Sequence, residues 1–261
     1  MVQTEFAFRA KKILEASTEI IGLAVGGSWL SNEIDEFSDL DLIVITEEKI
    51  TENKDLMFSY AKRLGDFLSG FTGEHVGEPR LIICLYDNPL LHVDIKFLTL
   101  QEFNHRVENP TVLFDRGGQL QRVIDQSTSV FPYPDYQWIE DRFWIWIHYS
   151  LLKIGRGEYF EAFDFFGFLR MTVFGPLLQI KNGNLPRSVR RVETDLERKD
   201  LESLKTTVPI YDRQSLLNSL HNSVTLYRKL REDLFDDTII FQNETEKRVM
   251  LYFTEIESRY I

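Results

Sequence analysis

The hydrophobic pattern of this chain changes near residue 131, and that change limits the folds it can adopt. Before it, short apolar runs such as Ile20–Val25 stop at glycine or polar residues, as buried strands do. Two prolines interrupt residues 131–135, and beyond them apolar residues recur only at helical spacing. We therefore expect two domains: a compact unit of helices and strands over 1–132, and an all-α helical bundle over 133–261.

Within the first domain, the spacing predicts an opening amphipathic helix before residue 18 and a second helix over 52–71. Apolar runs and alternation predict strands over 20–25, 40–45, 80–86 and 91–98, with a turn at 87–89. In the second domain, helical patterns cover 136–153, 159–180, 189–205, 212–234 and 244–260.

Composition excludes several classes of protein. With 43% hydrophobic residues the chain has enough apolar matter for a core, and its net charge of −11 argues against nucleic-acid binding through phosphate neutralisation. No apolar stretch approaches the ~20 residues that span a bilayer, and the N-terminus does not look like a signal peptide. The lone Cys84 lies in an apolar run, which predicts a buried thiol in a reducing compartment. We expect a soluble cytoplasmic protein with no membrane partner.

The most informative residues follow the first predicted strand. Gly26 and Gly27 let the backbone approach a ligand closely, and Ser28 begins a polar turn whose N–H groups suit a phosphate. Farther on, Asp39 and Asp41 stand at positions i and i+2 of a strand, so both carboxylates project from the same face. Two neighbouring carboxylates repel each other unless a cation lies between them, and Mg²⁺ shared with nucleotide phosphates would meet that need.

A third carboxylate follows on a later strand. Residues 92–97 alternate, with Asp94 on the face opposite Val93 and Ile95. If this strand lies beside the one that carries Asp39 and Asp41, three carboxylates converge on one site. A simpler interpretation stays open, in which Asp94 is a structural partner of Lys96 or His92.

These residues resemble the nucleotidyltransferase superfamily that includes DNA polymerase β and the antibiotic nucleotidyltransferases, over residues 20–98. The helical half is similar to that of the aminoglycoside (streptomycin) and lincosamide enzymes, although no diagnostic motif matches there. The resemblance implies an α+β fold: a polymerase β-like domain with a mixed sheet, then the helical bundle. It also implies that Asp39 and Asp41 bind Mg²⁺ or Mn²⁺, that Gly26, Gly27 and Ser28 hold nucleotide phosphates, and that Asp94 is a metal ligand or general base.

The resemblance implies an enzyme that transfers a nucleoside monophosphate from an NTP, with ATP expected, to a hydroxyl of a small acceptor, releasing pyrophosphate. An aminoglycoside-like antibiotic is the expected kind of acceptor, selected by the helical domain. Alternatives are a protein-modifying adenylyltransferase of toxin–antitoxin type, an RNA-end nucleotidyltransferase, and a catalytically idle relative that binds nucleotide and regulates a partner. The net charge of −11 disfavours the RNA enzyme.

Acidic residues in the second domain are candidates for acceptor binding. Glu158, Glu161 and Asp164 recur at three-residue spacing on one predicted helix and form a rough acidic stripe. A polycationic acceptor would suit such a stripe. The other interpretation is a helix face exposed to solvent.

Overall fold

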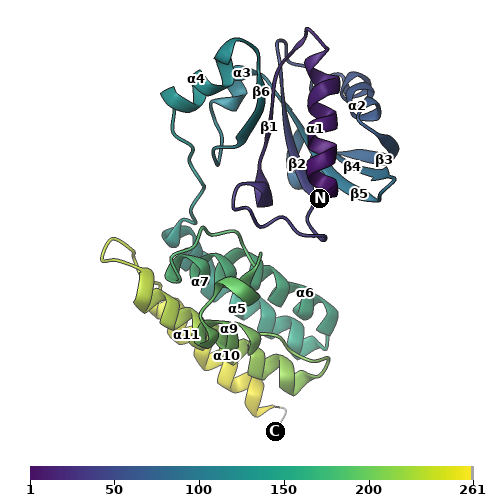
Figure 1. Ribbon diagram of the computed structural model, residues 1–261. Coiled ribbons are helices and arrows are strands. Elements are labelled where there is room, and N and C mark those ends of the chain that lie inside the picture. Colours follow the sequence, from purple (N-terminus) through teal and green to yellow (C-terminus); the bar gives the residue numbers. More distant parts are fainter. Residues whose placement is uncertain (260–261) are drawn as a thin grey trace. The chain divides into compact units, whose positions relative to one another are not determined.

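The computed structural model of this chain describes residues 1–259 (Figure 1). The chain divides into two compact units, Met1–Phe131 and Pro132–Ile261. Each unit encloses a hydrophobic core of its own. The predicted fold class, a mixed sheet followed by a helical region, is confirmed.

The first unit is built on a six-stranded sheet in the order β3-β4-β5-β2-β1-β6. The strands are β1 Ile20–Val25, β2 Leu40–Thr46, β3 Asp66–Gly73, β4 Glu78–Asp87, β5 Leu91–Leu98 and β6 Thr111–Asp115. Neighbouring strands are antiparallel except β2 and β5, which are parallel. That parallel pair lies at the centre of the sheet and carries two of the predicted site residues.

Helices α1 (Val2–Glu15) and α2 (Lys54–Arg63) cover one face of this sheet (Figure 1). Alternate residues of the central strands, such as Leu42 and Val93, are buried beneath them in the same core cluster. Because successive strand residues face opposite sides, the residues between them are turned to the other face. The apolar side chains thereby anchor the strands and leave that face for polar groups.

A smaller apolar cluster covers part of that other face. Helices α3 (Leu100–Phe103) and α4 (Gln119–Gln126) contribute Phe103 and Leu120, which pack with Ile45 and Leu98. Short 3₁₀ turns at Gly27–Trp29, Glu74–Val76 and Arg116–Gly118 complete the first unit. The cluster covers this face near the C-terminal ends of β2 and β5, where Ile45 and Leu98 lie.

The helix predicted over 52–71 is wrong in its second half. Helix α2 ends at Arg63, and the following residues form the edge strand β3, paired with β4 through contacts such as Phe71 with Ile83. Three glycines, Gly65, Gly70 and Gly73, weaken helix formation there. Pairing with β4 along the sheet edge therefore outweighs the apolar spacing that suggested a helix.

The second unit is all-α, as predicted. Its helices are α5 Tyr136–Arg156, α6 Tyr159–Leu169, α7 Gly175–Lys181, α8 Val192–Asp195, α9 Arg198–Lys205, α10 Arg213–Leu234 and α11 Asn243–Ser258. A π-helical turn, Arg170–Phe174, divides the helix predicted over 159–180, and the last predicted helix ran to residue 260, which lies outside the described residues. No helix within residues 1–259 is long and apolar enough to cross a bilayer.

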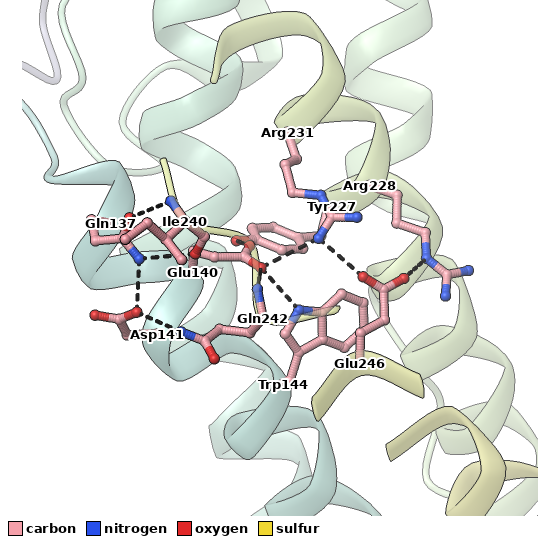
Figure 2. Close-up of polar contacts among 10 residues, drawn as sticks. All are labelled: Gln137, Glu140, Asp141, Trp144, Tyr227, Arg228, Arg231, Ile240, Gln242 and Glu246. Atoms are coloured by element: carbon pink, nitrogen blue, oxygen red, sulfur yellow. Dashed lines mark hydrogen bonds and ion pairs between the residues drawn. The ribbon is translucent and has the colours of Figure 1, made fainter. Parts of the chain in front are cut away.

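A buried polar network ties α5, α10 and the start of α11 together (Figure 2). The Glu140 side chain is fully buried and accepts hydrogen bonds from the Tyr227 hydroxyl at 2.5 Å and the Gln242 backbone N–H at 2.9 Å. Arg231 Nη1 lies 3.3 Å from Glu140 and 3.0 Å from Glu246. Since a buried charge is tolerated only when it is paired, this network fixes how the three helices meet.

The burial of Cys84 gives a direct test of the first core. Its side chain is 2% exposed, and burial raises the pKa of the thiol to about 12. Since the thiolate is the reactive form, very little of this buried thiol is in the reactive state at pH 7. We expect a thiol-reactive dye to label native protein far more slowly than protein unfolded in urea. Equal labelling rates at pH 7 would contradict this packing.

Candidate functional site

The glycine turn after β1 adopts a conformation that only glycine fits. Gly27 has a left-handed φ of 62°, and a Cβ built on it would lie 1.9 Å from Asp41 Oδ2. That separation is far below van der Waals contact, so any side chain here would displace the Asp41 carboxylate. The Gly26 N–H donates to the Asp41 carbonyl at 3.0 Å, which joins the turn to the start of β2. The turn and Asp41 are therefore a single packed unit.

Asp41 and Asp94 lie side by side. They are register partners on the parallel strands β2 and β5, whose backbones are about 4.8 Å apart in a typical sheet. Both side chains are half-buried and lie on the face opposite the apolar residues beneath α1 and α2. The strand order thus provides the juxtaposition that the sequence prediction required.

Asp39 directly precedes β2 and is half-buried. Its charge is close enough to contribute to the raised pKa of Asp94. The preceding loop is held by Gln3, a buried residue of α1, which donates to the backbone carbonyls of Asp35 at 2.9 Å and Ser38 at 2.8 Å. A residue near the N-terminus therefore positions Asp39, and no motif in the sequence signalled this.

Asp94 has a histidine partner. His92 Nε2 lies 2.9 Å from Asp94 Oδ1. Burial raises the pKa of Asp94, the contact with His92 opposes that rise, and the charge of Asp39 adds to it. A carboxylate with a raised pKa, oriented by a neighbouring imidazole, is suited to accept a proton.

Lys96 is engaged elsewhere. Its ammonium lies 2.7 Å from Glu78 Oε2, and Arg80 Nε donates to the other oxygen of that carboxylate at 2.6 Å. Although burial alone would raise it, hydrogen bonds from Arg80 and Lys96 lower the pKa of Glu78 to about 2. Of the two structural partners considered for Asp94, the structure shows His92.

The carboxylates of this site are oxygen donors of the kind that a divalent cation prefers. Within residues 1–259, no group of three or more His, Cys, Asp or Glu side chains is placed so that it could hold a metal ion. Mg²⁺ is commonly held by only one or two carboxylates, and takes its remaining ligands from water and phosphate oxygens. Asp41 beside Asp94, with Asp39 close by, offers hard oxygen donors of that kind.

Sequence reasoning missed Glu108. This half-buried residue lies between α3 and β6, and its Oε1 accepts a hydrogen bond from the Gly27 N–H at 3.0 Å. The two residues are 81 positions apart, and Glu108 belongs to no recognisable motif. Only the pairing of β1 with β6 brings its loop to the turn.

The acidic stripe of the helical unit is partly neutralised. Lys153 Nζ lies 2.9 Å from carboxylate oxygens of both Glu158 and Glu161. Asp164 is exposed on the same helix. A cavity of about 400 Å³ in this unit is lined by Arg170, Leu201 and Leu204 among others, and by none of the three acids. Binding of an acceptor by these residues stays a prediction.

No protein-family model matches the chain, and no curated protein matches it. Among solved structures, it is similar to an aminoglycoside 6-adenyltransferase from Bacillus subtilis, with 17% identity and a TM-score of 0.41 over 98% of this chain and 97% of that one. It is also similar to a spectinomycin adenyltransferase from Enterococcus faecialis, solved with ATP and spectinomycin, with 14% identity and a TM-score of 0.32 over 97% and 99%. These two structures are adenyltransferases named for antibiotics, and they align with this chain along nearly their whole length.

Proposed function

We propose that this protein is a metal-dependent nucleotidyltransferase that moves a nucleoside monophosphate from an NTP, with ATP expected, to a hydroxyl of a small acceptor. One observation carries the proposal: Asp41 and Asp94 are register partners on adjacent parallel strands, beside a glycine turn that packs against Asp41. Paired carboxylates suit the metal ions of phosphoryl transfer, and a glycine turn lets a phosphate approach the backbone closely.

In this mechanism Asp39 and Asp41 would hold the divalent cation, and the turn of Gly26, Gly27 and Ser28 would receive the phosphates. A cation bound there would supply positive charge to offset the negative charge that develops on the transferred phosphate and the leaving pyrophosphate. Asp94 accepts the proton of the attacking hydroxyl. Its raised pKa makes it a stronger base than an ordinary carboxylate. His92 orients Asp94 through their 2.9 Å contact.

We assign choice of the acceptor to the helical unit. We further propose that the acceptor is an aminoglycoside-like polycation, which contacts Glu158, Glu161 and Asp164. Asp164 is the residue best suited to a cationic ligand, since Lys153 already pairs with the two glutamates. Exchange of Asp164 for Asn, assayed with cationic and neutral acceptors, separates this proposal from a neutral acceptor.

Binding of ATP should require a divalent cation. Because charge neutralisation by a bound metal is worth several kcal/mol, we expect the affinity for ATP to fall at least ~10-fold when Mg²⁺ is chelated. Asp41→Asn should bind weakly in both conditions. Asp125→Asn, a change at an exposed position on α4, is the matched control and should bind like the unaltered protein.

Isothermal calorimetry with and without a chelator measures both effects. Equal affinity in the two conditions, or normal binding by Asp41→Asn, would remove the support for this site. A second assay follows pyrophosphate release with labelled ATP and a panel of hydroxyl acceptors. Metal-dependent binding without turnover on any acceptor would favour the catalytically idle relative, and labelling of a protein would favour the protein-modifying enzyme.

A further inference from the structure

We propose that Glu108 is a positioning residue, which fixes the Gly26–Gly27 turn in the geometry that the site needs. The inference rests on the proposed function, because the turn is the place where that function puts the nucleotide phosphates. Glu108 touches no reacting atom in this proposal. It acts through the backbone of Gly27.

The turn is held between two carboxylates. On one side, Glu108 Oε1 accepts from the Gly27 N–H at 3.0 Å and would lie 3.1 Å from a Cβ built on Gly26. On the other side, the Asp41 carboxylate occupies the space where a Gly27 side chain would be. Consecutive glycines have the greatest backbone freedom of any pair of residues, so an anchor on this amide restricts the turn more than it would elsewhere.

Glu108 itself is tethered at both ends of its loop. Two residues before it, the buried Arg106 donates to Asn109 Oδ1 at 2.7 Å and to the hydroxyl and carbonyl of Ser127 at 2.6 and 2.7 Å. Soon after it, Thr111 pairs with Val25, the residue that precedes the turn. The loop is therefore fastened to α4 on one side and to β1 on the other, which keeps Glu108 at Gly27.

In this proposal Glu108 serves as a fixed hydrogen-bond acceptor. A carboxylate at this position could instead compete with phosphate or bind a metal ion. A carboxylate that competes with phosphate for the Gly27 amide would weaken nucleotide binding. A metal ligand would need its negative charge. Glutamine separates the three roles, because its amide oxygen accepts the same hydrogen bond without the charge.

The experiment compares Glu108→Ala and Glu108→Gln, with His105→Ala as an exposed control on the same loop. Selective ¹⁵N labelling of the 14 glycines reports the Gly27 amide without any need for activity. Loss of one hydrogen bond should raise hydrogen exchange at this amide roughly 3- to 10-fold in Glu108→Ala. Glu108→Gln and His105→Ala should stay close to the unaltered protein.

In turnover assays, Glu108→Ala should raise the KM for ATP by a similar factor of roughly 3- to 10-fold. Glu108→Gln should restore it, and the pH profile should be unchanged in both, since Glu108 carries no proton in the reaction. Tighter ATP binding by Glu108→Ala would overturn the proposal in favour of competition with phosphate. Failure of Glu108→Gln to restore the KM would show that the charge is what matters.

The positioning role of Glu108 and the proposed function of the protein can be tested separately. If hydrogen exchange at the Gly27 amide is the same in Glu108→Ala as in the unaltered protein, Glu108 does not position the turn, whether or not the protein is an active enzyme. If the unaltered protein neither binds ATP nor turns it over, the proposed function fails, while the amide measurement still reports the contact. If Glu108→Ala does not fold, the test uses Glu108→Gln alone. Hydrogen exchange at the Gly27 amide and the KM for ATP should then match those of the unaltered protein, and a large difference in either would contradict the proposal.

Discussion

Replacing Asp94 by asparagine is expected to reduce turnover at least ~100-fold while the protein stays folded, since general-base assistance alone is typically worth ~10²–10⁴-fold. Asparagine preserves the size of the side chain and cannot accept the proton of an attacking hydroxyl. The apolar face of β5, with Val93 and Ile95 buried, anchors the strand without help from Asp94. Loss of chemistry without loss of the fold is therefore the expected result.

The pH dependence of stability gives an independent check on the same variant. A carboxyl group whose pKa is raised by folding stabilises the native state while it is protonated, and that contribution is lost as the pH rises through the raised value. At neutral pH the ionised Asp94 therefore costs stability, because it is half-buried and close to Asp39. Asp94→Asn should melt at the same temperature as the unaltered protein or higher.

Both measurements belong on one preparation: thermal unfolding without metal, and turnover at saturating Mg²⁺ and ATP. The activity of the unaltered protein should fall as acid protonates Asp94, since only the ionised carboxylate can accept the proton. Near-normal turnover by Asp94→Asn would exclude Asp94 as the base. A variant that unfolds would instead identify the contact with His92 as structural.

Truncation of Glu140 to alanine is expected to destabilise the helical unit by about 3–5 kcal/mol, the usual result of breaking a buried ion pair. The change leaves Arg231, whose side chain is 14% exposed, without one of its two acidic partners, and removes the acceptor of the buried Tyr227 hydroxyl (Figure 2). Burial and the Glu140 hydrogen bond both raise the pKa of Tyr227, so this hydroxyl stays a donor at neutral pH.

Asp141→Ala is the matched control, because Asp141 is the next residue on α5, is exposed, and also accepts hydrogen bonds. It should cost no more than ~1 kcal/mol, as exposed polar contacts do. Urea unfolding followed by circular dichroism measures both variants. Equal losses for Glu140→Ala and Asp141→Ala would mean that the buried network contributes no more than a surface contact.

The sequence by itself determined four of the six strands and their faces, while β3 was predicted as helix and β6 was not predicted. Apolar runs located β1 and β2, and strict alternation located β5, because a residue's side of a sheet follows from its position along the strand. The same period of two put Asp41 and Asp94 on the polar faces of their strands. Where the apolar spacing fitted both a helix and a strand, at residues 66–73, local pattern was not enough, and pairing with β4 decided the outcome.

Only the tertiary structure decided which distant groups meet. The parallel pairing of β2 with β5 places Asp41 beside Asp94, and the pairing of β1 with β6 brings Glu108 to Gly27. Likewise, Lys153 pairs with Glu158 and Glu161, although both carboxylates also remain partly exposed to solvent. Periodicity describes the environment of one element, whereas these contacts depend on strand order and helix packing, which arise from the burial of the whole core. The residue types of the candidate site could therefore be read from the sequence, whereas their contact partners could not.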